Sequence, residues 1–445
     1  MNTRSEDILK KVWLISALFL GLLPAFASTP AQADEEGTPA WSRQEASQIE
    51  RTDDNTAPYI SQEEIDQMAP NHWVWDTWPL RNRDGSVATV KGYKVIFALT
   101  APDDVLPGKR HDMATIRYFY SKNGQDWKMG GEAFDTTDAY GSRQWAGSAM
   151  VEDDGSIHLF YTATGRKGNE QLTYEQRLAL ANGEMEVTKD GIEFSDWSHD
   201  IILTPDGEYY QTEAQSEGGI LYSFRDPWFF EDKHTGETYI TFEGNSAGQA
   251  SDQVCQPRNI GDESFQQTHE APDGSAEFNG NVGLAVSKSE DLTEWEALPP
   301  VLEADCVNQQ LERPHFVMKG NQYYLFVDSH KFTFAPGIQG PDGLYGFTAD
   351  SLYGNYEPLN GSGLVVANPE DNPFQAYSWI VLPNGKVISF INFVELGDVS
   401  LVDVGSQPES FQYEHFGGTL APTLKLKINK NQTQIIKELD DGRIK

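Results

Sequence analysis

The sequence predicts an all-β protein built as a five-bladed β-propeller, and two observations carry this prediction. The first is a hairpin turn that recurs at similar intervals, at Gly85, Gly155, Gly236, Gly320 and Gly385. The second is a short apolar, β-prone run after every turn, at 93–97, 158–161, 239–242, 323–326 and 387–390. Because a repeated turn-and-strand unit is typical of radial β architectures, five units predict five blades.

Three of these turns are preceded by an acid, namely Asp76, Asp226 and Glu312. If the strand before each turn is the innermost of its blade, all three acids face a central axial pocket. Taken alone, an acid near a turn is more often a solvated side chain or a cap for backbone N–H groups. Three acids in equivalent positions of a repeat favour a site, and the residues beside them are Trp75, Trp78, Arg225 and Arg313.

Such a set of acids is typical of sugar cleavage. Retaining glycoside cleavage needs a carboxylate nucleophile and a second carboxyl group, about 5 Å away, that first donates and then accepts a proton. The two groups must lie in different environments, so that one stays ionised while the other stays protonated.

The N-terminus reads as a secretory signal over residues 1–33. Arg4, Lys10 and Lys11 precede an apolar run at 12–23, and Ala-x-Ala sites follow at 25–27 and 31–33. A membrane anchor is the weaker alternative, because the run is shorter than the roughly 20 residues that span a bilayer. We expect a secreted protein, extracellular or periplasmic, with a disordered acidic lead-in at 34–55 and a catalytic domain at 56–445.

The chain is strongly acidic, with 68 acids, 33 bases and a net charge of −35. Nucleic acid and anionic lipid would be repelled, so we expect neither nucleic acid nor a membrane as a partner. The charge fits a protein hydrated in high salt, where screening removes self-repulsion. It fits an ordinary acidic secreted enzyme equally well.

Only Cys255 and Cys306 are present. Two cysteines in an exported chain pair more often than not, because that compartment is oxidising. The bond would close a loop of about 50 residues and stabilise the fold by about 4 kcal/mol. No Cys or His cluster has metal-ligand spacing and no Gly-rich loop cradles phosphate, so we expect no metal and no cofactor.

Several segments together resemble one family. They are 74–80 (VWDTWPL), 144–148 (QWAGS), 224–227 (FRDP), 242–245 (FEGN), 311–314 (LERP) and 418–422 (GTLAP). With these motifs in this order, the chain resembles the bacterial levansucrases and inulosucrases, which are fructosyltransferases acting on sucrose. The resemblance spans roughly residues 70 to 425 and is greatest to levansucrases of Gram-negative bacteria.

The resemblance implies a five-bladed propeller and a role for each acid. Asp76 would be the nucleophile, Glu312 the general acid/base, and Asp226 the transition-state stabiliser that binds the fructosyl hydroxyls. The substrates would be sucrose and fructan acceptors, and we expect the protein to act as a monomer.

The same resemblance assigns substrate-binding residues. Trp75, Trp145 and Arg225 would line the fructosyl subsite, and Arg313 would pair close to the acid/base. His330 stands where related proteins carry a His or an Arg that influences the choice between water and a sugar acceptor. The alternative is that His330 is a structural histidine at the end of a strand, with its hydrogen bonds satisfied.

Tyr377 precedes the fifth turn as the acids precede theirs, so it is expected near the axis. That it is a structural tyrosine of the core fits the sequence nearly as well. Calcium-binding relatives carry acidic ligands where this chain has 219–222 and 308–310, so no calcium site is expected. Cys255 and Cys306 resemble a pair that forms a disulfide in some relatives.

Three functions remain compatible with these residues. The first is a fructosyltransferase that makes levan or short fructooligosaccharides, or an inulosucrase that joins the same units differently. The second is a β-fructofuranosidase, which passes the fructosyl group mainly to water. The third, a non-catalytic sugar-binding propeller, would be expected to lack one of the acids.

Overall fold

The computed structural model describes residues 37–169, 171–216 and 222–445. The predicted signal peptide at 1–33 lies outside the described residues. Within the described ranges, no helix combines the length and the apolar character needed to cross a membrane.

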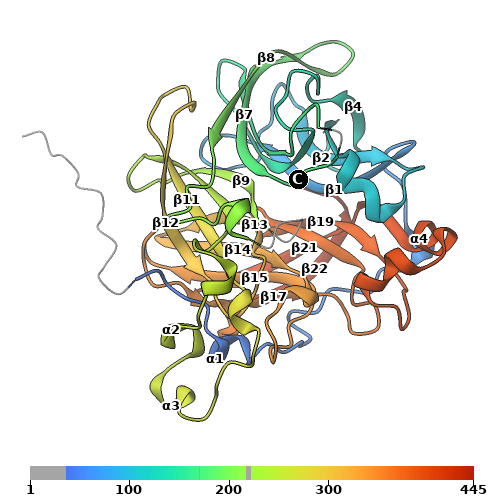
Figure 1. Ribbon diagram of the computed structural model, residues 1–445. Helices are drawn as coiled ribbons and strands as arrows, with labels where there is room; N and C mark the ends of the chain where they lie inside the picture. Colours follow the sequence, from blue (N-terminus) through green and yellow to red (C-terminus); the bar gives the residue numbers. More distant parts are fainter. Residues whose placement is uncertain (1–36, 170, 217–221) are drawn as a thin grey trace, which may run out of the picture. The chain divides into compact units, whose positions relative to one another are not determined.

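The regular structure is dominated by strands, which confirms the predicted all-β class (Figure 1). The strands are β1 (His72–Arg81), β2 (Lys94–Pro102), β3 (Thr115–Ser121), β4 (Lys128–Glu132), β5 (Arg143–Val151), β6 (Ser156–Thr164), β7 (Gln176–Val187), β8 (Ile192–Leu203), β9 (Phe224–Glu231), β10 (Thr238–Asn245), β11 (Gly280–Ser287), β12 (Trp295–Glu303), β13 (Glu312–Lys319), β14 (Gln322–Ser329), β15 (Gly343–Ala349), β16 (Glu357–Pro358), β17 (Leu364–Ala367), β18 (Ala376–Val381), β19 (Lys386–Phe393), β20 (Phe416–Leu420), β21 (Pro422–Asn429) and β22 (Gln432–Asp441).

The helices of the described chain are short and lie outside the sheets (Figure 1). The α-helices are α1 (Arg43–Ala46), α2 (Pro257–Ile260), α3 (Glu263–Gln266) and α4 (Glu409–His415). The 3₁₀ helices are η1 (Gln62–Glu64), η2 (Pro107–Met113), η3 (Glu213–Gln215), η5 (Ala250–Asp252), η6 (Ser275–Glu277), η7 (Lys331–Thr333), η8 (Leu359–Gly361) and η9 (Leu401–Ser406).

Strands that follow one another in the chain pair mainly antiparallel. One eight-stranded sheet contains β1–β4 and β5–β8, which are joined by parallel pairing of β1 with β5. The other sheets contain β9–β12, β13–β17 and β18–β22. We call these five sets of consecutive strands the strand groups.

Each predicted turn lies between the first and second strands of a strand group. The glycines at these turns are Gly85, Gly155, Gly236, Gly320 and Gly385, with φ values of 83, 99, 75, 65 and 78°. Glycine adopts this left-handed backbone without the steric cost that a Cβ atom brings. The turn chemistry therefore located the strand groups correctly.

The first strand of every group is buried along nearly its whole length and contains an irregularity in its pairing. The register shifts fall between Trp75 and Trp78 in β1, Trp145 and Gly147 in β5, Arg225 and Trp228 in β9, Glu312 and His315 in β13, and Tyr377 and Ile380 in β18. A β-bulge leaves residues out of the hydrogen-bonded ladder and re-aims their side chains. These bulges position the site.

The segment 34–55, predicted to be a disordered lead-in, is ordered from residue 37 onward. Trp41 is 1% exposed and packs its ring against Phe334, Tyr345 and Phe347 at centroid distances of 5.3–5.9 Å. Its backbone N–H donates to the carbonyl of Glu303 at 2.8 Å. Long-range packing of one aromatic side chain thus orders a stretch whose composition is polar.

Cys255 and Cys306 form a disulfide with a Cα–Cα distance of 5.7 Å, which confirms the predicted pairing. The bond joins the segment just before α2 to the connection between β12 and β13. It therefore ties the long excursion between β10 and β11 to the framework of the sheets.

Candidate active site

Bulges in the first strands place the two aspartates. Asp76 and Asp226 have left-handed backbones, with φ of 47° and 61°. Aspartate is among the few residues that visit this region, because its short polar side chain can bond locally. In β13 and β18 the left-handed position is occupied by Arg313 (51°) and Ser378 (59°).

The sequence predicts that the three acids occupy equivalent positions. The structure shows that Glu312 is not the positional equivalent of the two aspartates. In the pairing registers, Glu312 takes the place of Trp75 and Arg225, one residue before the left-handed position. The acids still converge because neighbouring positions of a bulge direct their side chains into the same space from different strands.

The three acids line one pocket of about 140 Å³, which we call the carboxylate pocket. Its walls are Asp76, Leu99, His111, Trp145, Ala146, Arg225, Asp226, Gln310, Glu312, His330 and Phe332. A smaller recess of about 60 Å³ shares all three acids and adds Arg313 and Tyr377. Trp75 lines neither; it is fully buried and packs edge-on against His111, with ring centroids 5.5 Å apart.

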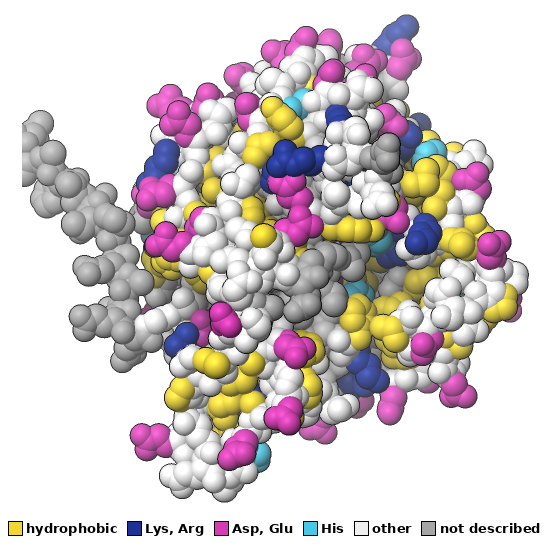
Figure 2. All heavy atoms as spheres, in the orientation of Figure 1, with side chains coloured by type: hydrophobic (Ala, Val, Ile, Leu, Met, Phe, Trp, Pro, Cys, Tyr) yellow, Lys and Arg dark blue, Asp and Glu magenta, His cyan; other side chains and the backbone are white. Residues whose placement is uncertain are grey.

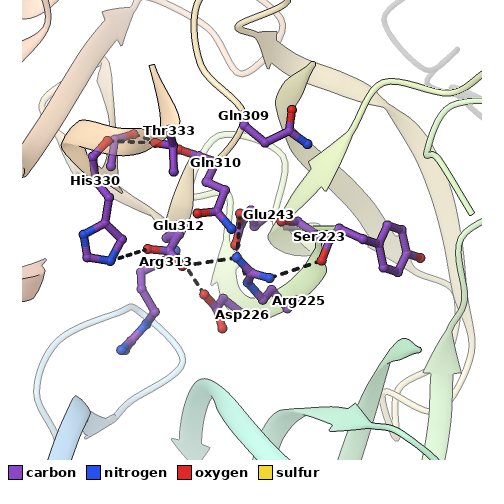
Figure 3. Close-up of polar contacts among 12 residues, drawn as sticks. Ser223, Arg225, Asp226, Glu243, Gln309, Gln310, Glu312, Arg313, His330 and Thr333 are labelled. Carbon is purple, nitrogen blue, oxygen red and sulfur yellow. Dashed lines mark hydrogen bonds and ion pairs between the residues drawn. The ribbon is translucent and has the colours of Figure 1, made fainter. Parts of the chain in front are cut away.

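Arg225 lies between two glutamates, as Figure 3 shows. Its Nη2 is 3.1 Å from Glu312 Oε1, and its Nε is 2.7 Å from Glu243 Oε2. Burial raises the pKa of the fully buried Glu243 carboxyl to about 8, although Arg225 opposes the shift. The guanidinium thus connects the pocket acid Glu312 to a second acid behind it.

Arg313 contacts both aspartates. Its backbone N–H donates to Asp226 Oδ2 at 3.2 Å, and its Nη1 is 3.8 Å from Asp76 Oδ1. The side chain is held by hydrogen bonds from Nη1 to Ser378 Oγ at 2.7 Å and from Nη2 to the Thr77 carbonyl at 3.2 Å. Arg313, the residue after the candidate acid/base Glu312, thus pairs its cation with Asp76 in the same pocket.

Glu312 also contacts His330 and Tyr377. His330 Nε2 lies 3.8 Å from Glu312 Oε2 (Figure 3). The Tyr377 hydroxyl donates to the same oxygen. On its other side, His330 Nδ1 is hydrogen-bonded to the buried Asp342 at 2.7 Å. The His330 ring stacks on Tyr377 with centroids 3.7 Å apart and planes 8° apart.

These contacts give the acids different pKa shifts. Burial raises the pKa of Asp76 against the opposing charge of Arg313, and burial raises that of Asp226 to about 6. For Glu312 burial acts in the same direction, but His330 and Arg225 outweigh it and the pKa is lowered. Burial lowers the pKa of His330, but Asp342 and Glu312 outweigh it, so the imidazole favours its charged form.

Several residues of the site escaped sequence analysis. Arg110 and His111 come from η2, in a connection with no periodic pattern. Glu243 stands within the FEGN segment, but only the pairing of β10 with β9 places it opposite Arg225. Asp342 follows a Gly-Pro pair that reads as a turn. Only folding reveals that it holds His330.

In the part of the chain that the structure describes, no group of three or more His, Cys, Asp or Glu side chains could hold a metal ion. Of the two stretches compared with calcium-binding relatives, 308–310 is described, whereas 219–221 lies outside the described residues.

The sequence profile of the Levansucrase/Invertase family matches residues 31–445. The chain belongs to the Levansucrase/Invertase family. This confirms the resemblance that the six motifs indicated.

Members of the Levansucrase/Invertase family resemble the chain over most of its length. An inulosucrase from Halalkalicoccus jeotgali, solved with bound kestose, is 49% identical and superposes with a TM-score of 0.84 over 92% of this chain and 97% of that one. A levansucrase from Rahnella aquatilis is 37% identical over 91% of this chain and 95% of its own length. The β-fructofuranosidase catalytic domain from Microbacterium saccharophilum K-1 is 34% identical, with a TM-score of 0.80 over 94% of this chain and 95% of that one.

Proposed function

We propose that the protein is a sucrose fructosyltransferase of the levansucrase type, which releases glucose and builds levan or fructooligosaccharides. The observation that carries this proposal is the carboxylate pocket. There Asp76, Asp226 and Glu312 converge and are held by Arg225 and Arg313. The family relatives named inulosucrase and levansucrase support the choice of sucrose as substrate.

In the proposed first step, Asp76 attacks the anomeric carbon of the fructosyl unit. A bond forms between an Asp76 oxygen and that carbon, while the bond to the glucosyl oxygen breaks and Glu312 gives that oxygen its proton. Arg313 at 3.8 Å favours the ionised Asp76 that such an attack needs. Asp226 would accept hydrogen bonds from the fructosyl hydroxyls.

In the proposed second step, an acceptor hydroxyl attacks the fructosyl carbon and displaces Asp76. Glu312, now ionised, takes the proton of that hydroxyl, so the enzyme returns to its first state. The acceptor is a sugar in transfer and water in hydrolysis. Positioning of that hydroxyl therefore decides the product.

Glu312 needs a proton for the first step, although its surroundings favour the ionised form. We assign this proton to the Glu312–His330 pair as a unit, because the two groups are 3.8 Å apart and shift each other's pKa in opposite directions. In the free pocket the proton rests on the imidazole. It reaches the glycosidic oxygen by way of Glu312.

We further propose that the strand groups are the five blades of a propeller. Supporting this are the five turns, the antiparallel order within each group and the burial of all five first strands. A first strand that is buried on both sides is expected for the innermost strand of a blade. The carboxylate pocket would then be axial.

The test is the fate of both halves of sucrose. The purified protein is incubated with concentrated sucrose, and glucose, free fructose and polymer are measured. A transferase releases more glucose than free fructose, the difference being fructosyl units in products. Equal amounts would assign a β-fructofuranosidase, and no glucose would overturn the proposal.

An inulosucrase is the second candidate, because the relative with that name shares 49% of its residues with this chain. The two products differ in linkage, β-2,6 in levan and β-2,1 in inulin. Methylation analysis of the polymer distinguishes them without reference to the catalytic acids, which both reactions share.

We also propose that the protein is exported as a monomer after removal of residues 1–33, and that neither nucleic acid nor a membrane binds the mature chain. The acidic composition supports the last point, because polyanions would be repelled. N-terminal sequencing of the exported protein and light scattering test the cleavage and the oligomeric state. A retained leader or a dimer would contradict them.

A further inference from the structure

A separate cavity, of about 200 Å³, lies at the ends of four first strands, on the turn side of their bulges. We call it the Arg81 cavity. Its walls come from the ends of β1, β9, β13 and β18 and from the turns that follow β1, β9 and β18. None of its residues lines the carboxylate pocket or the recess beside it, so a molecule bound there does not contact the three acids.

Arg81, the last residue of β1, is buried in this wall with only 2% of its surface exposed. The central carbon of its guanidinium lies 3.8 Å from the ring centroid of Trp228 and 4.2 Å from that of Phe229. Its Nη2 donates to the Phe229 carbonyl at 2.7 Å. Aromatic faces attract a cation through their quadrupole but bring no negative charge that would neutralise it.

No Asp or Glu of the described chain forms an ion pair with Arg81. Of the two acids that line the cavity, Asp84 is exposed, and Glu231 faces Arg83 Nη1 at 3.6 Å. Burial lowers the pKa of the Arg81 guanidinium and no carboxylate opposes that shift, although an arginine stays charged in proteins. Buried Arg225, by contrast, lies between two glutamates. The Arg81 cation is therefore buried without a counterion.

Nη1 is the guanidinium nitrogen that can contact a ligand. Nε has neither a partner nor accessible surface, and Nη2 is taken by the Phe229 carbonyl. Nη1 makes no hydrogen bond to the described residues and is not enclosed by them, so its two N–H groups remain available toward the cavity. Exposed Lys233 adds a second positive charge to the same wall, and its Nζ donates to the Gly320 carbonyl.

The rest of the wall is mostly apolar. Trp228, Phe230, Phe316 and Val381 line the cavity, and each is at most 6% exposed. Figure 2 shows acidic side chains spread over the visible face of the molecule, and with a net charge of −35 the surface as a whole repels anions. Binding of an anion in this cavity therefore depends on the local cation and on the burial of apolar surface.

We propose that the Arg81 cavity binds a monovalent organic carboxylate. One carboxylate oxygen accepts a hydrogen bond from Nη1 of Arg81, and the apolar body of the ligand lies against Trp228, Phe230 and Phe316. A single charge fits because one buried cation faces the cavity. An apolar body fits because these walls offer a small hydrated anion few partners. The site lies apart from the proposed reaction, and the inference does not depend on the proposed function.

The first experiment compares two ligands of the same shape, benzoate and its neutral amide, benzamide. Calorimetry at neutral pH and constant ionic strength should give benzoate a Kd at least about tenfold lower, because only benzoate forms a charge-assisted hydrogen bond. Arg81→Met removes the charge from a side chain of similar length, so it should raise the benzoate Kd at least about tenfold and leave the benzamide Kd almost unchanged. The matched control is Arg166→Met, which removes an exposed arginine paired with Glu175 outside the cavity; both Kd values stay unchanged.

The second experiment leaves Arg81 in place. Met318 lines the cavity and is half-buried, so Met318→Trp fills the apolar space. This variant should raise the benzoate Kd at least about tenfold. In crystals of the unaltered protein soaked with 4-bromobenzoate, the anomalous signal of bromine should lie in the Arg81 cavity, with the carboxylate beside Arg81.

Equal Kd values for benzoate and benzamide, or a benzoate Kd that folded Arg81→Met leaves unchanged, would overturn the site. A bromine signal in the carboxylate pocket would overturn it too, as would displacement of benzoate by equimolar chloride, which would assign a halide instead. Thermal melting establishes that each variant is folded. The proposed function fails separately, through the absence of glucose when the unaltered protein meets sucrose.

Discussion

At the scale of single residues, the site depends on backbone conformations that few side chains tolerate. Asp76 and Asp226 both lie in the left-handed region, and both carry charges that burial opposes. Strained residues with perturbed pKa values cluster at functional sites because a surrounding framework must hold them there. Substitutions at these positions therefore act on conformation as well as on chemistry.

Asp76 allows these two effects to be separated. Asp76→Asn and Asp76→Ala should both abolish sucrose cleavage, because neither side chain forms the covalent intermediate. Asn tolerates φ of 47°, whereas Ala adds roughly 1 kcal/mol of backbone strain. Activity assays and denaturant unfolding of both variants test this. Substantial turnover by either variant would remove Asp76 from the role of nucleophile.

Glu312→Gln should be nearly inactive on sucrose, since the amide cannot deliver a proton to the leaving oxygen. A fructoside with a good leaving group needs no such proton, so its first step should be partly restored. The comparison of the two substrates in stopped-flow assays is the measurement. If sucrose and the activated fructoside lose rate equally, Glu312 does not act as the acid.

His330 is expected to influence both acceptor choice and pH dependence. His330→Ala should leave cleavage measurable, raise free fructose relative to glucose and reduce polymer most. The variant also removes the cation that holds the pKa of Glu312 down. In the unaltered protein the shared proton rests on the imidazole, whose pKa is raised by Asp342 and Glu312. Without His330 only Glu312 holds that proton and loses it at lower pH, so the alkaline limb of kcat/KM moves downward.

Asp342 provides the control for the His330 experiment. Without His330, the buried Asp342 carboxylate loses its ion-pair partner, at a cost of roughly 3 kcal/mol, and keeps only the backbone N–H of Lys331. His330→Ala combined with Asp342→Asn should recover much of that stability while keeping the altered product ratio. An unchanged ratio and an unchanged pH profile in both variants would make His330 a structural histidine.

At the scale of elements, the bulges in the first strands, rather than the regular parts of those strands, position the residues of the site. Four of them share one pattern, in which two residues oppose one on the partner strand and the first of the two is left-handed. This arrangement lets adjacent positions, such as Glu312 and Arg313, serve the same pocket. The connections η2 and η7 complete the walls of that pocket through His111 and Phe332.

The disulfide is the main covalent constraint on these connections. Mass spectrometry without reductant should detect linked peptides that contain Cys255 and Cys306, and denatured protein should label with no free thiol. Reduction should lower the free energy of unfolding by about 4 kcal/mol in the chain-entropy model. Activity below the new melting temperature should persist, since neither cysteine lines the carboxylate pocket. Two reactive thiols per chain would contradict the bond.

At the scale of the whole molecule, the dominant property is a net charge of −35. Excess charge of one sign raises the energy of a compact state through self-repulsion, and counterions screen it over about 8 Å at physiological salt and about 3 Å at 1 M. A neutral sugar substrate loses nothing through this screening. The charge therefore affects stability and solubility without contributing to binding.

Stability and activity are accordingly expected to hold or rise from dilute buffer to molar salt. Sodium chloride and potassium chloride should act alike, because screening depends on ionic strength. Melting temperature and glucose release across a salt series measure the effect. A steep loss toward molar salt would contradict adaptation to salt and leave the enzymatic proposal untouched.

By itself, the sequence determined the elements whose causes are local. Gly85, Gly155, Gly236, Gly320 and Gly385 marked the turns because only glycine adopts their φ freely, and the runs after them read as strands. The motifs around the three acids are also short runs of sequence, and they were sufficient to indicate the family. Spacing in the chain was sufficient for these predictions.

Tertiary structure alone decided how these pieces meet. The one-residue offset of Glu312, the pairing of Arg313 with Asp76 and the contact of Asp342 with His330 all depend on strand registers and on residues distant in the chain. The order of residues 37–55 likewise follows from the packing of Trp41 against rings some 300 residues away. Burial and long-range contact override local composition, because the free energy they contribute arises only once the fold brings those surfaces together.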